Sequence, residues 1–457
     1  MDKKKNAQYV ELGLAELHLN RLATQVVSSK HQTSWRISPA PLLLSAPQTE
    51  ALRHVGKTML AFYRVADSLY YRSLAEKKLF FVAEYLEKGK SDTVIKLMRS
   101  ERFRGALPFI MRPDLLWTES GFVATEFDSL PGGAGILAGM EQLYGELGFA
   151  VSDTAGAFIS AVKSIHKNDL FLVVVSDESA AYRSEMTYLV SALNLSGVPA
   201  AIARPEEVQL REDGVLFRDQ RVGTVYRFFE LFDLESVPHG LELLRMAEKG
   251  KVQVFPTPKA HLEEKMWFAL LRYPQLRPYW EKEMGVNGYS SLLKLIPKSY
   301  ILDPQPLPAH AVIGGLRQHG HEVNDFRDML NLSRGERNFV IKPSGFSSAA
   351  WGSHGIALGK ELSTKSWNDE LDRALSSYSV SPHLLQEYHY SLIQEMEYMA
   401  HDTGDILSFR GKYRYCPYFF VDGKRSYSGG ILITAVPVEK PLIHGMTDAV
   451  LCPAILA

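Results

Sequence analysis

The chain has 457 residues, of which 46% are apolar and 23% are charged, and its formal net charge is -1. This length and composition are typical of a globular protein with two or three compact domains. The balanced charge argues against a bulk surface for nucleic acid or membrane, and no run of eighteen apolar residues predicts a membrane span. The cysteines, Cys416 and Cys452, are too few for a disulfide framework, and no apolar segment follows the basic residues at the start. We therefore expect a cytoplasmic protein that binds neither nucleic acid nor membrane.

Residues 48–100 are predicted to form a helical packing layer, because apolar side chains recur three and four positions apart. Examples are Leu52, Val55, Met59, Phe62 and Val65. The prolines upstream, from Pro39 to Pro47, predict a linker. The basic stretch from Lys88 to Arg104 is typical of the solvated face of a helix.

Two short strands, 115–117 and 122–127, are predicted around a polar tip. Their antiparallel pairing would place Asp114 across the hairpin from Glu126 and Asp128. Glu126 and Asp128 would share one face, because side chains alternate along a strand.

Mg²⁺ binds through one or two carboxylates together with phosphate oxygens and water. The hairpin therefore predicts a magnesium triphosphate site at Asp114, Glu126 and Asp128. Arg112 would supply a planar cation for the same phosphates. The alternative interpretation is a hairpin with a solvated acidic face.

A glycine-rich run, 131–135, follows the hairpin and leads into a predicted helix over 136–144. The backbone amides at the start of a helix carry a partial positive charge. We expect these amides to lie beside the metal site.

Residues 168–232 predict an α/β unit. The expected elements are strand 170–175, helix 182–195, strand 200–203 and two strands around 212–214. A crevice at the carboxyl end of the first strand is the default position for a ligand. Arg227 lies inside an otherwise apolar strand, where such a residue either extends to the rim or holds an anion.

A second segment has the character of a phosphate site. An apolar strand, 339–342, ends at Lys342, and a loop of glycine and serine continues to Gly355. Such a loop can turn its backbone N–H groups toward phosphate oxygens, and Lys342 would add a point charge there. It is not a Walker loop, and the alternative is a surface β-hairpin with a flexible tip. We expect this segment to be the nucleotide half of the site that the carboxylates begin.

This second segment resembles the lysine strand and glycine-rich flap of ATP-grasp ligases, and residues 384–388 resemble the hinge strand of that family. The order of parts, with the carboxylates before the lysine strand, is similar to the circularly permuted branch typified by the synthetase domain of glutathionylspermidine synthetase. The R-x-D and E-x-N pattern of that branch matches Arg112, Asp114 and Glu126, whereas Asp128 replaces the asparagine.

The resemblance implies an α+β, circularly permuted, glutathione synthetase-like ATP-grasp fold with a Rossmann-like α/β substrate domain and a helical N-terminal layer. Residues 1–150 would hold the helical region and the metal-carboxylate hairpin. Residues 151–255 would be the substrate domain that precedes the ATP-grasp module. Residues 256–457 would be the nucleotide-binding subdomains with the lysine strand, flap and hinge.

The resemblance also implies roles for individual residues. ATP would be contacted by Lys265, Lys342, Gly345, Ser347, Ser348, Gly352, Gly355, Gln386, Glu387 and Tyr388. Lys265 is favoured as the first nucleotide lysine by its place at a helix start, with Lys298 as its competitor. Arg112 and Lys342 would act as catalytic cations, and Mg²⁺ would bind Asp114, Glu126 and Asp128. Substrate contacts are expected at Ser129, Arg227 and Arg410, and Arg410 or Arg414 would replace the flap arginine of the family.

The implied function is an ATP-dependent carboxylate-amine ligase that forms an amide through an acylphosphate and releases ADP and phosphate. Its partners would be a small-molecule acid and amine, with ATP and Mg²⁺ as cofactors, and the sequence leaves the substrates and the oligomeric state open. One alternative is a catalytically inactive nucleotide-binding scaffold that partners a biosynthetic enzyme, motivated by Asp128 and by the altered 131–135 run. A kinase acting on a non-carboxylate acceptor is the other.

Overall fold

The computed structural model describes residues 2–20, 35–307, 313–318, 320–347, 355–423, 425–445 and 449–457. Its contacts divide the chain into two compact units. Unit 1 comprises Met1–Ala61, Ser100–Pro258 and Tyr390–Ala457, and unit 2 comprises Phe62–Arg99 and Lys259–His389. The expected division into three domains at residues 150 and 255 remains a prediction.

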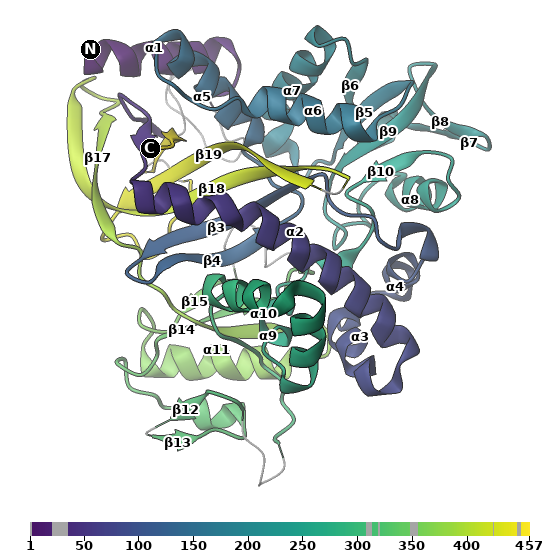
Figure 1. Ribbon diagram of the computed structural model, residues 1–457, viewed down its shortest axis with the longest axis vertical. Helices are drawn as coiled ribbons and strands as arrows, with labels where there is room; N and C mark the ends of the chain where they lie inside the picture. The colour runs from purple at the N-terminus through teal and green to yellow at the C-terminus, as the bar shows by residue number, and fades with distance from the viewer. Residues whose placement is uncertain are drawn as a thin grey trace. The chain divides into compact units, whose positions relative to one another are not determined.

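Unit 1 contains an eight-stranded sheet built from both ends of the chain (Figure 1). Its strands run in the order β1-β20-β19-β18-β3-β4, with β17 beside β18 and β2 beside β20. Their bounds are β1 Arg36–Ile37, β2 Leu42–Leu43, β3 Ile110–Thr118, β4 Gly121–Asp128, β17 Ile393–Met399, β18 Ile406–Asp422, β19 Arg425–Pro437 and β20 Val450–Ile455. The predicted hairpin is confirmed, with Asp114 opposite Glu126.

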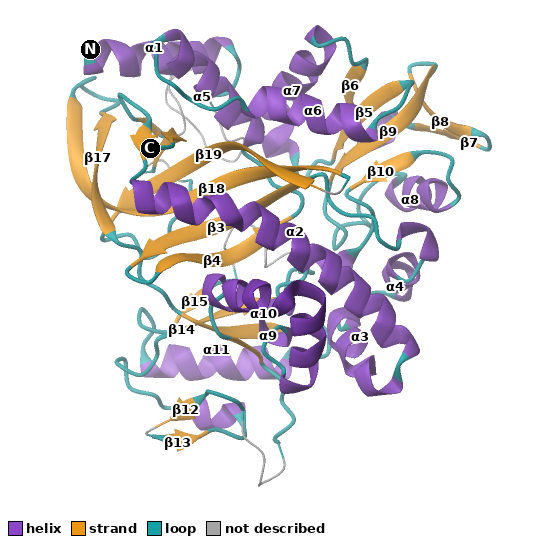
Figure 2. Cartoon of the chain, viewed as in Figure 1, coloured by secondary structure: helices purple, strands orange, loops and turns teal. Residues whose placement is uncertain are grey.

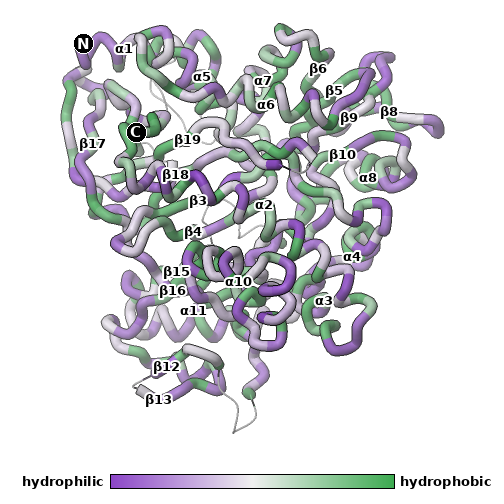
Figure 3. Tube along the Cα trace, in the orientation of Figure 1, coloured by the Kyte–Doolittle hydropathy of each residue, from purple (hydrophilic) through white to green (hydrophobic). Residues whose placement is uncertain are grey.

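The pairing of β3 with β18 connects segments that are far apart in the sequence. Leu115 lies opposite Tyr415, and Met111 lies opposite Phe419. The second half of β18 and most of β19 are buried, and in Figure 3 short hydrophobic segments alternate with polar ones along both strands. Burial of apolar surface therefore attaches the hairpin to the C-terminal strands.

The second sheet of unit 1 has the order β6-β5-β9-β8-β7, with β10 beside β9. Its bounds are β5 Leu170–Val175, β6 Ala200–Ala203, β7 Gln209–Arg211, β8 Gly214–Phe217, β9 Gln220–Phe228 and β10 Gln253–Phe255. Strand β5 is buried along its whole length between the parallel strands β6 and β9, as expected for the centre of a parallel sheet. The predicted α/β unit is confirmed, and the tip of the β7–β8 hairpin is hydrophilic in Figure 3.

Helices pack against these sheets and share one core with them (Figure 2). They are α1 Lys3–Glu16, α5 Ala134–Glu146, α6 Thr154–Ile165 and α7 Arg183–Leu195. Helix α8, Gly240–Glu248, packs beside β8 and β10. Helix α2, Ala46–Ala75, begins in unit 1 and ends in unit 2. Among the described helices, none combines the length and apolar character that a membrane crossing requires.

Unit 2 is built around a four-stranded sheet with the order β11-β16-β14-β15. The strands are β11 Ser299–Ile301, β14 Phe339–Pro343, β15 Ala357–Leu358 and β16 His383–Glu387, and a separate hairpin consists of β12 Arg317–Gln318 and β13 His321–Glu322. The helices are α3 Phe80–Glu87, α4 Asp92–Met98, α9 Trp267–Leu270, α10 Arg277–Leu295 and α11 Thr364–Ser376. The predicted helical layer, lysine strand and hinge strand are therefore confirmed as elements of secondary structure.

Glu141 is a carboxylate inside the core of unit 1, on helix α5. Its Oε2 accepts a hydrogen bond of 2.7 Å from the amide of Thr154, whereas its Oε1 is buried without a hydrogen-bond partner. Burial raises the pKa of Glu141 to about 7, although the Thr154 amide favours the ionised form. Because the folded state prefers the protonated acid, ionisation of Glu141 destabilises the fold as the pH rises from its unfolded pKa through 7.

We predict that Glu141→Gln changes the pH dependence of stability. Glutamine does not ionise, so the variant does not lose stability through this group as the pH rises. From pH 5 to pH 8, the free energy of unfolding of the variant minus that of wild type should increase by roughly 2 kcal/mol. Urea unfolding at both pH values measures this difference. Glu119→Gln, at the exposed tip of the hairpin, is the control. Parallel pH profiles for Glu141→Gln and wild type would contradict the prediction.

Candidate functional site

The charged residues of the predicted metal site lie in unit 1 and share one face of the eight-stranded sheet. Arg112 and Asp114 are two positions apart on β3 and therefore point to the same side. They lie opposite Asp128 and Glu126 across the hairpin. Strand β18 adds Arg414, whose Nη1 lies 3.0 Å from an Asp114 carboxylate oxygen. The fold thus assembles two arginines and three carboxylates from three strands.

Asp114 is the centre of this charge network. Its Oδ1 accepts a hydrogen bond of 2.9 Å from Arg112 Nε, and its Oδ2 accepts the bond from Arg414. The thiol of Cys416 donates to Oδ1 at 3.4 Å. Burial alone would raise the pKa of Asp114, but the two guanidinium groups outweigh burial and hold the pKa below its usual value. Asp114 is therefore an ionised anchor for both arginines.

Asp128 is less well compensated. It lies 3.2 Å from Arg112 Nη2 and accepts a hydrogen bond of 2.8 Å from the amide of Leu130. Burial raises the pKa of Asp128 to about 6 in spite of Arg112, and the neighbouring Glu126 carboxylate adds to the rise. This end of the network carries more negative charge than its cation neutralises.

The donor set can be compared with the needs of Mg²⁺. Among the described residues, no group of three or more His, Cys, Asp or Glu side chains is arranged to hold a metal ion. Mg²⁺ requires only one or two carboxylates when phosphate and water complete its shell. Glu126 and Asp128 share a strand face, and Asp128 is only partly compensated by Arg112, so both carboxylates fit as ligands. Asp114 Oδ1 accepts hydrogen bonds from Arg112 and Cys416, whereas Oδ2 accepts one from Arg414 and keeps a lone pair for the ion.

The loop between β4 and α5 is bonded to the same face. The carbonyl of Gly132 accepts hydrogen bonds of 2.8 Å from Arg112 Nη1 and 2.5 Å from the hydroxyl of Tyr418. Gly133, at the N-cap of α5, has φ of 94°, a conformation that glycine adopts without strain. Arg112 therefore connects Asp114, Asp128 and this loop.

A buried carboxylate occupies the amides at the start of α5. Glu185, from α7, accepts hydrogen bonds of 2.8 and 2.9 Å from the amide of Gly133 and of 2.9 Å from the amide of Gly135. Burial raises the pKa of Glu185 to about 7, although the amides favour its ionised form. The start of α5 lies beside Arg112, which binds the Gly132 carbonyl, and a carboxylate of the protein accepts the hydrogen bonds of its first amides.

The three expected substrate residues have different environments. Ser129 is buried directly after β4. Arg227 is fully buried, and its guanidinium donates to the carbonyls of Pro256 and Phe229 at 2.9 and 2.8 Å. These bonds account for a cation in an otherwise apolar strand, and a substrate role for Arg227 stays a prediction. Arg410 is exposed on β18, and Arg414 is the arginine of that strand that reaches the carboxylates.

In unit 2 the lysine strand and the hinge strand are paired in register. Lys342 lies opposite Leu384, and Gln386 lies opposite Val340. Lys342 and Gln386 therefore share one face of the sheet, and the side chain of Glu387 belongs to the other. The Nζ of Lys298 lies 3.3 Å from Glu387. The hinge backbone continues to Tyr388, whose amide donates to the carbonyl of Asn338 at 3.0 Å.

The segment before Lys265 contacts the first residues of the flap. A Cβ at Gly345 would overlap the carbonyl oxygen of Glu263, so only glycine allows this approach. Ser347 and Gly355 are described at the two ends of the flap, whereas Ser348 and Gly352 lie outside the described residues.

The expectation of a solvated face over residues 88–104 is wrong at one position. Lys90 is buried and forms an ion pair with Glu264 in which both side chains are inaccessible. Arg99 fits the expectation better, because its ion pair with Glu87 at 2.6 Å remains partly exposed.

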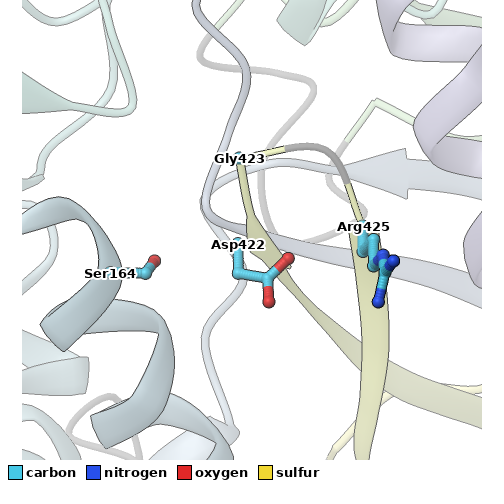
Figure 4. A pocket seen from close by; sticks show the side chains of 4 residues that line it. All are labelled: Ser164, Asp422, Gly423 and Arg425. Atoms are coloured by element: carbon cyan, nitrogen blue, oxygen red, sulfur yellow. The ribbon is translucent and has the colours of Figure 1, made fainter.

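The pockets lined by described residues include one in each unit. One, of about 490 Å³, lies at the β18–β19 turn, where Figure 4 shows Ser164, Asp422, Gly423 and Arg425. It contains no predicted site residue. The other, of about 410 Å³, lies at the end of the hinge strand in unit 2 and is lined by Arg317, Gln318, Leu332, Glu336, Asn338, Phe339, Glu387, Tyr388 and His389.

Sequence reasoning missed Glu185 and Lys90. Glu185 lies on the apolar face of an amphipathic helix, one residue before Met186 and four before Leu189. A carboxylate at such a position could have been predicted to be buried. Lys90 lies between a glycine and a helix-capping serine, and nothing local marks it as buried.

No family model matches the sequence, and no curated protein matches it significantly. A glutathione synthetase-like effector, GSS30, from Globodera pallida, solved in its apo form, aligns with a TM-score of 0.61 and 10% identity. The alignment covers 99% of this chain and 97% of that one. A provisionally named gamma-glutamylcysteine synthetase from Methylobacillus flagellatus aligns with a TM-score of 0.44 and 12% identity over 89% of this chain and 87% of its own. The chain therefore has a mixed α+β, glutathione synthetase-like fold.

We predict that Asp114→Asn lowers the free energy of unfolding by about 3 kcal/mol, because it removes the carboxylate that binds Arg414 and one of the two that bind Arg112. Urea unfolding at pH 7 measures the change. Asp213→Asn is the matched control, because Asp213 is 85% exposed and its ion pair with Arg221 spans 3.9 Å. Equal losses in the two variants would show that Asp114 does not anchor the arginines.

We also predict that Glu126→Gln lowers the pKa of Asp128 from about 6, because a neighbouring negative charge is removed. Carboxyl chemical shifts followed by NMR titration measure this pKa. Glu119→Gln again serves as the control. An unchanged or higher pKa would show that Glu126 and Asp128 do not share the site.

Proposed function

We propose that this chain is an ATP-dependent carboxylate-amine ligase with a circularly permuted ATP-grasp arrangement. The observation that carries the proposal is the convergence, inside unit 2, of three segments with nucleotide-binding character. The strand of Lys342 pairs with the hinge strand, and the flap begins against the segment that precedes Lys265. The glutathione synthetase-like fold supports the same interpretation. The pairing of β3 with β18 supports a permuted order, since it joins the early hairpin to the C-terminal strands.

The reaction begins when a substrate carboxylate oxygen attacks the γ-phosphorus of ATP. The bond to the β,γ-bridging oxygen breaks, and ADP leaves with the electron pair. The amine nitrogen then attacks the acylphosphate, phosphate leaves, the nitrogen loses a proton, and an amide remains. This sequence requires no protein nucleophile. Cys416 and Cys452 suit that requirement, because burial raises the pKa of each thiol to about 12 and keeps it protonated.

The protein contributes charge and position. Lys265 and Lys342 would offset phosphate charge, and the backbone of the flap would cover the phosphates and exclude water. The hinge backbone at Gln386, Glu387 and Tyr388 would bind the adenine. Mg²⁺ on Glu126 and Asp128 would neutralise developing charge on the transferred phosphoryl group.

The arginines of the hairpin and of β18 would bind phosphate oxygens. Asp114 holds Arg112 and Arg414 in one plane of the sheet, so the two guanidinium groups are presented together. Planar guanidinium groups match phosphate oxygens in pairs. Arg112 is the proposed catalytic arginine, and Arg414 would take the place of the flap arginine.

A nucleotide-binding scaffold without turnover is the second candidate. It is favoured by hydrogen bonds within the protein that occupy groups a substrate or nucleotide could otherwise bind. Asp114 is bonded to two arginines, and Glu185 is bonded to the loop amides that an anionic substrate could use. Such a protein would bind ATP and release no ADP.

We predict that the wild-type protein binds ATP and releases ADP in a magnesium-dependent manner when the correct acid and amine are present. Lys342→Ala should weaken ATP binding by at least about tenfold, because a phosphate cation is lost. Calorimetry and ADP release, measured with pools of amino acids, small peptides and polyamines, test this. Lys365→Ala, an exposed lysine on α11, is the control.

The products distinguish the candidate functions. A new amide with ADP and phosphate identifies a ligase, whereas a stable phosphorylated product identifies a kinase. Tight ATP binding without ADP under any pool identifies the scaffold. Wild-type protein that fails to bind ATP would refute both nucleotide-binding proposals.

A further inference from the structure

Two buried ionic contacts hold the chain segment that leads to Lys265. The first is made by Asp67 of helix α2, whose Oδ1 lies 2.7 Å from Lys259 Nζ and 3.0 Å from His261 Nε2. The side chains of all three residues are at most 3% exposed. The indole of Trp267 donates to the carbonyl of His261 at 2.6 Å. This end of the segment is therefore attached to the helical layer of unit 2.

The second contact is the ion pair between Lys90 and Glu264. Lys90 lies in the turn between α3 and α4, and Glu264 directly precedes Lys265. Both side chains are fully buried. The same ammonium group lies 4.8 Å from the centre of the Phe346 ring, in the flap. Lys90 therefore contacts both the Lys265 segment and the flap.

The beginning of the flap packs onto the same place. Gly345 approaches the carbonyl of Glu263 so closely that a Cβ could not be accommodated. Burial raises the pKa of Glu264, and the ammonium group of Lys90 opposes the rise. Residues 263–265 and 345–346 thus meet around one buried ion pair.

Stability alone does not explain a charged pair at this position. Removing two charges from water costs several kcal/mol per ion, and hydrophobic residues of similar volume often stabilise a fold as well or better. An ion pair has a directional geometry that apolar packing lacks, since its charged atoms must meet at hydrogen-bonding distance. A pair at the junction of two ligand-binding segments therefore suits a role in placing them.

We propose that Lys90 and Glu264 are positioning residues for the nucleotide site, and that they set Lys265 and the first flap residues relative to one another. The helical layer of residues 62–99 then takes part in ATP binding without touching ATP. The inference rests on the proposed ATP-binding role of Lys265 and the flap. It assigns a function to a layer that sequence reasoning treated as packing alone.

The test uses the double variant Lys90→Met/Glu264→Met, which removes both charges and leaves neither partner unpaired. We expect the double variant to fold, with a thermal midpoint within a few degrees of wild type. Its ATP affinity should be at least about tenfold weaker. Its Gly345 amide should exchange hydrogen at least about tenfold faster. Lys96→Met, an exposed lysine on α4, should change neither ATP affinity nor exchange. Calorimetry with ATP and Mg²⁺ measures affinity, and mass spectrometry or NMR measures exchange.

Wild-type affinity together with wild-type exchange in the folded double variant would overturn the inference. If the double variant does not fold, Glu264→Gln is measured instead, because it keeps the shape of the side chain and one acceptor oxygen. Wild-type ATP affinity and wild-type exchange at Gly345 in this variant would likewise overturn the inference. Absence of ATP binding in the wild type refutes the proposed function instead. The exchange rate of Gly345 then decides by itself whether the ion pair places the flap.

Discussion

The pairing of β3 with β18 is the constraint on which the candidate site in unit 1 depends. It brings Asp114 to Arg414, which is 300 positions later in the sequence, at a distance of 3.0 Å. The same pairing places Tyr418 within hydrogen-bonding reach of the loop after β4. The apolar side chains of these strands supply the burial that holds the pairing, and the charged residues occupy the face that the pairing creates. Arg112 alone, on its own hairpin, would lack the second cation and the loop anchor.

The two units use buried charge in different ways. In unit 1 three carboxylates face two arginines near the hairpin, and burial, together with the Glu126 carboxylate, raises the pKa of Asp128. In unit 2 the buried charges at Asp67, Lys259, Lys90 and Glu264 are paired within the protein. An unbalanced cluster is suited to a ligand, whereas a balanced one is suited to holding backbone segments in place. This difference supports the proposed metal role for the charged cluster of unit 1 and the proposed positioning role for the buried ion pairs of unit 2.

Glu185 and Asp114 bear on the choice between a ligase and a scaffold. Each carboxylate satisfies donors that an anionic substrate or a phosphate could otherwise use. In a ligase, substrates would exchange with these internal contacts, and the free energy of the exchange would come from nucleotide binding. In a scaffold, the contacts would simply persist. The chemistry at the hairpin is therefore decided by competition between internal and external partners for the same arginines and amides.

The local elements follow from sequence pattern alone. The hairpin, the lysine strand, the hinge strand and the α/β unit all formed where alternation and turn residues predicted them, and Asp114 lies opposite Glu126 as expected. These predictions succeed because strand alternation and turn chemistry act over a few residues. The roles of the predicted site residues, and the division into three domains, stay predictions.

Tertiary structure alone decided which charges meet. Nothing near Lys90 marks it as the partner of Glu264, and the carbonyl acceptors of Arg227, at Phe229 and Pro256, are visible only in the fold. Charged side chains pair according to distance in space, and in this chain those distances are set by long-range sheet and helix packing. The sequence by itself therefore determined the elements and the kinds of chemistry they carry. The fold determined which of those groups hold one another and which remain able to bind a ligand.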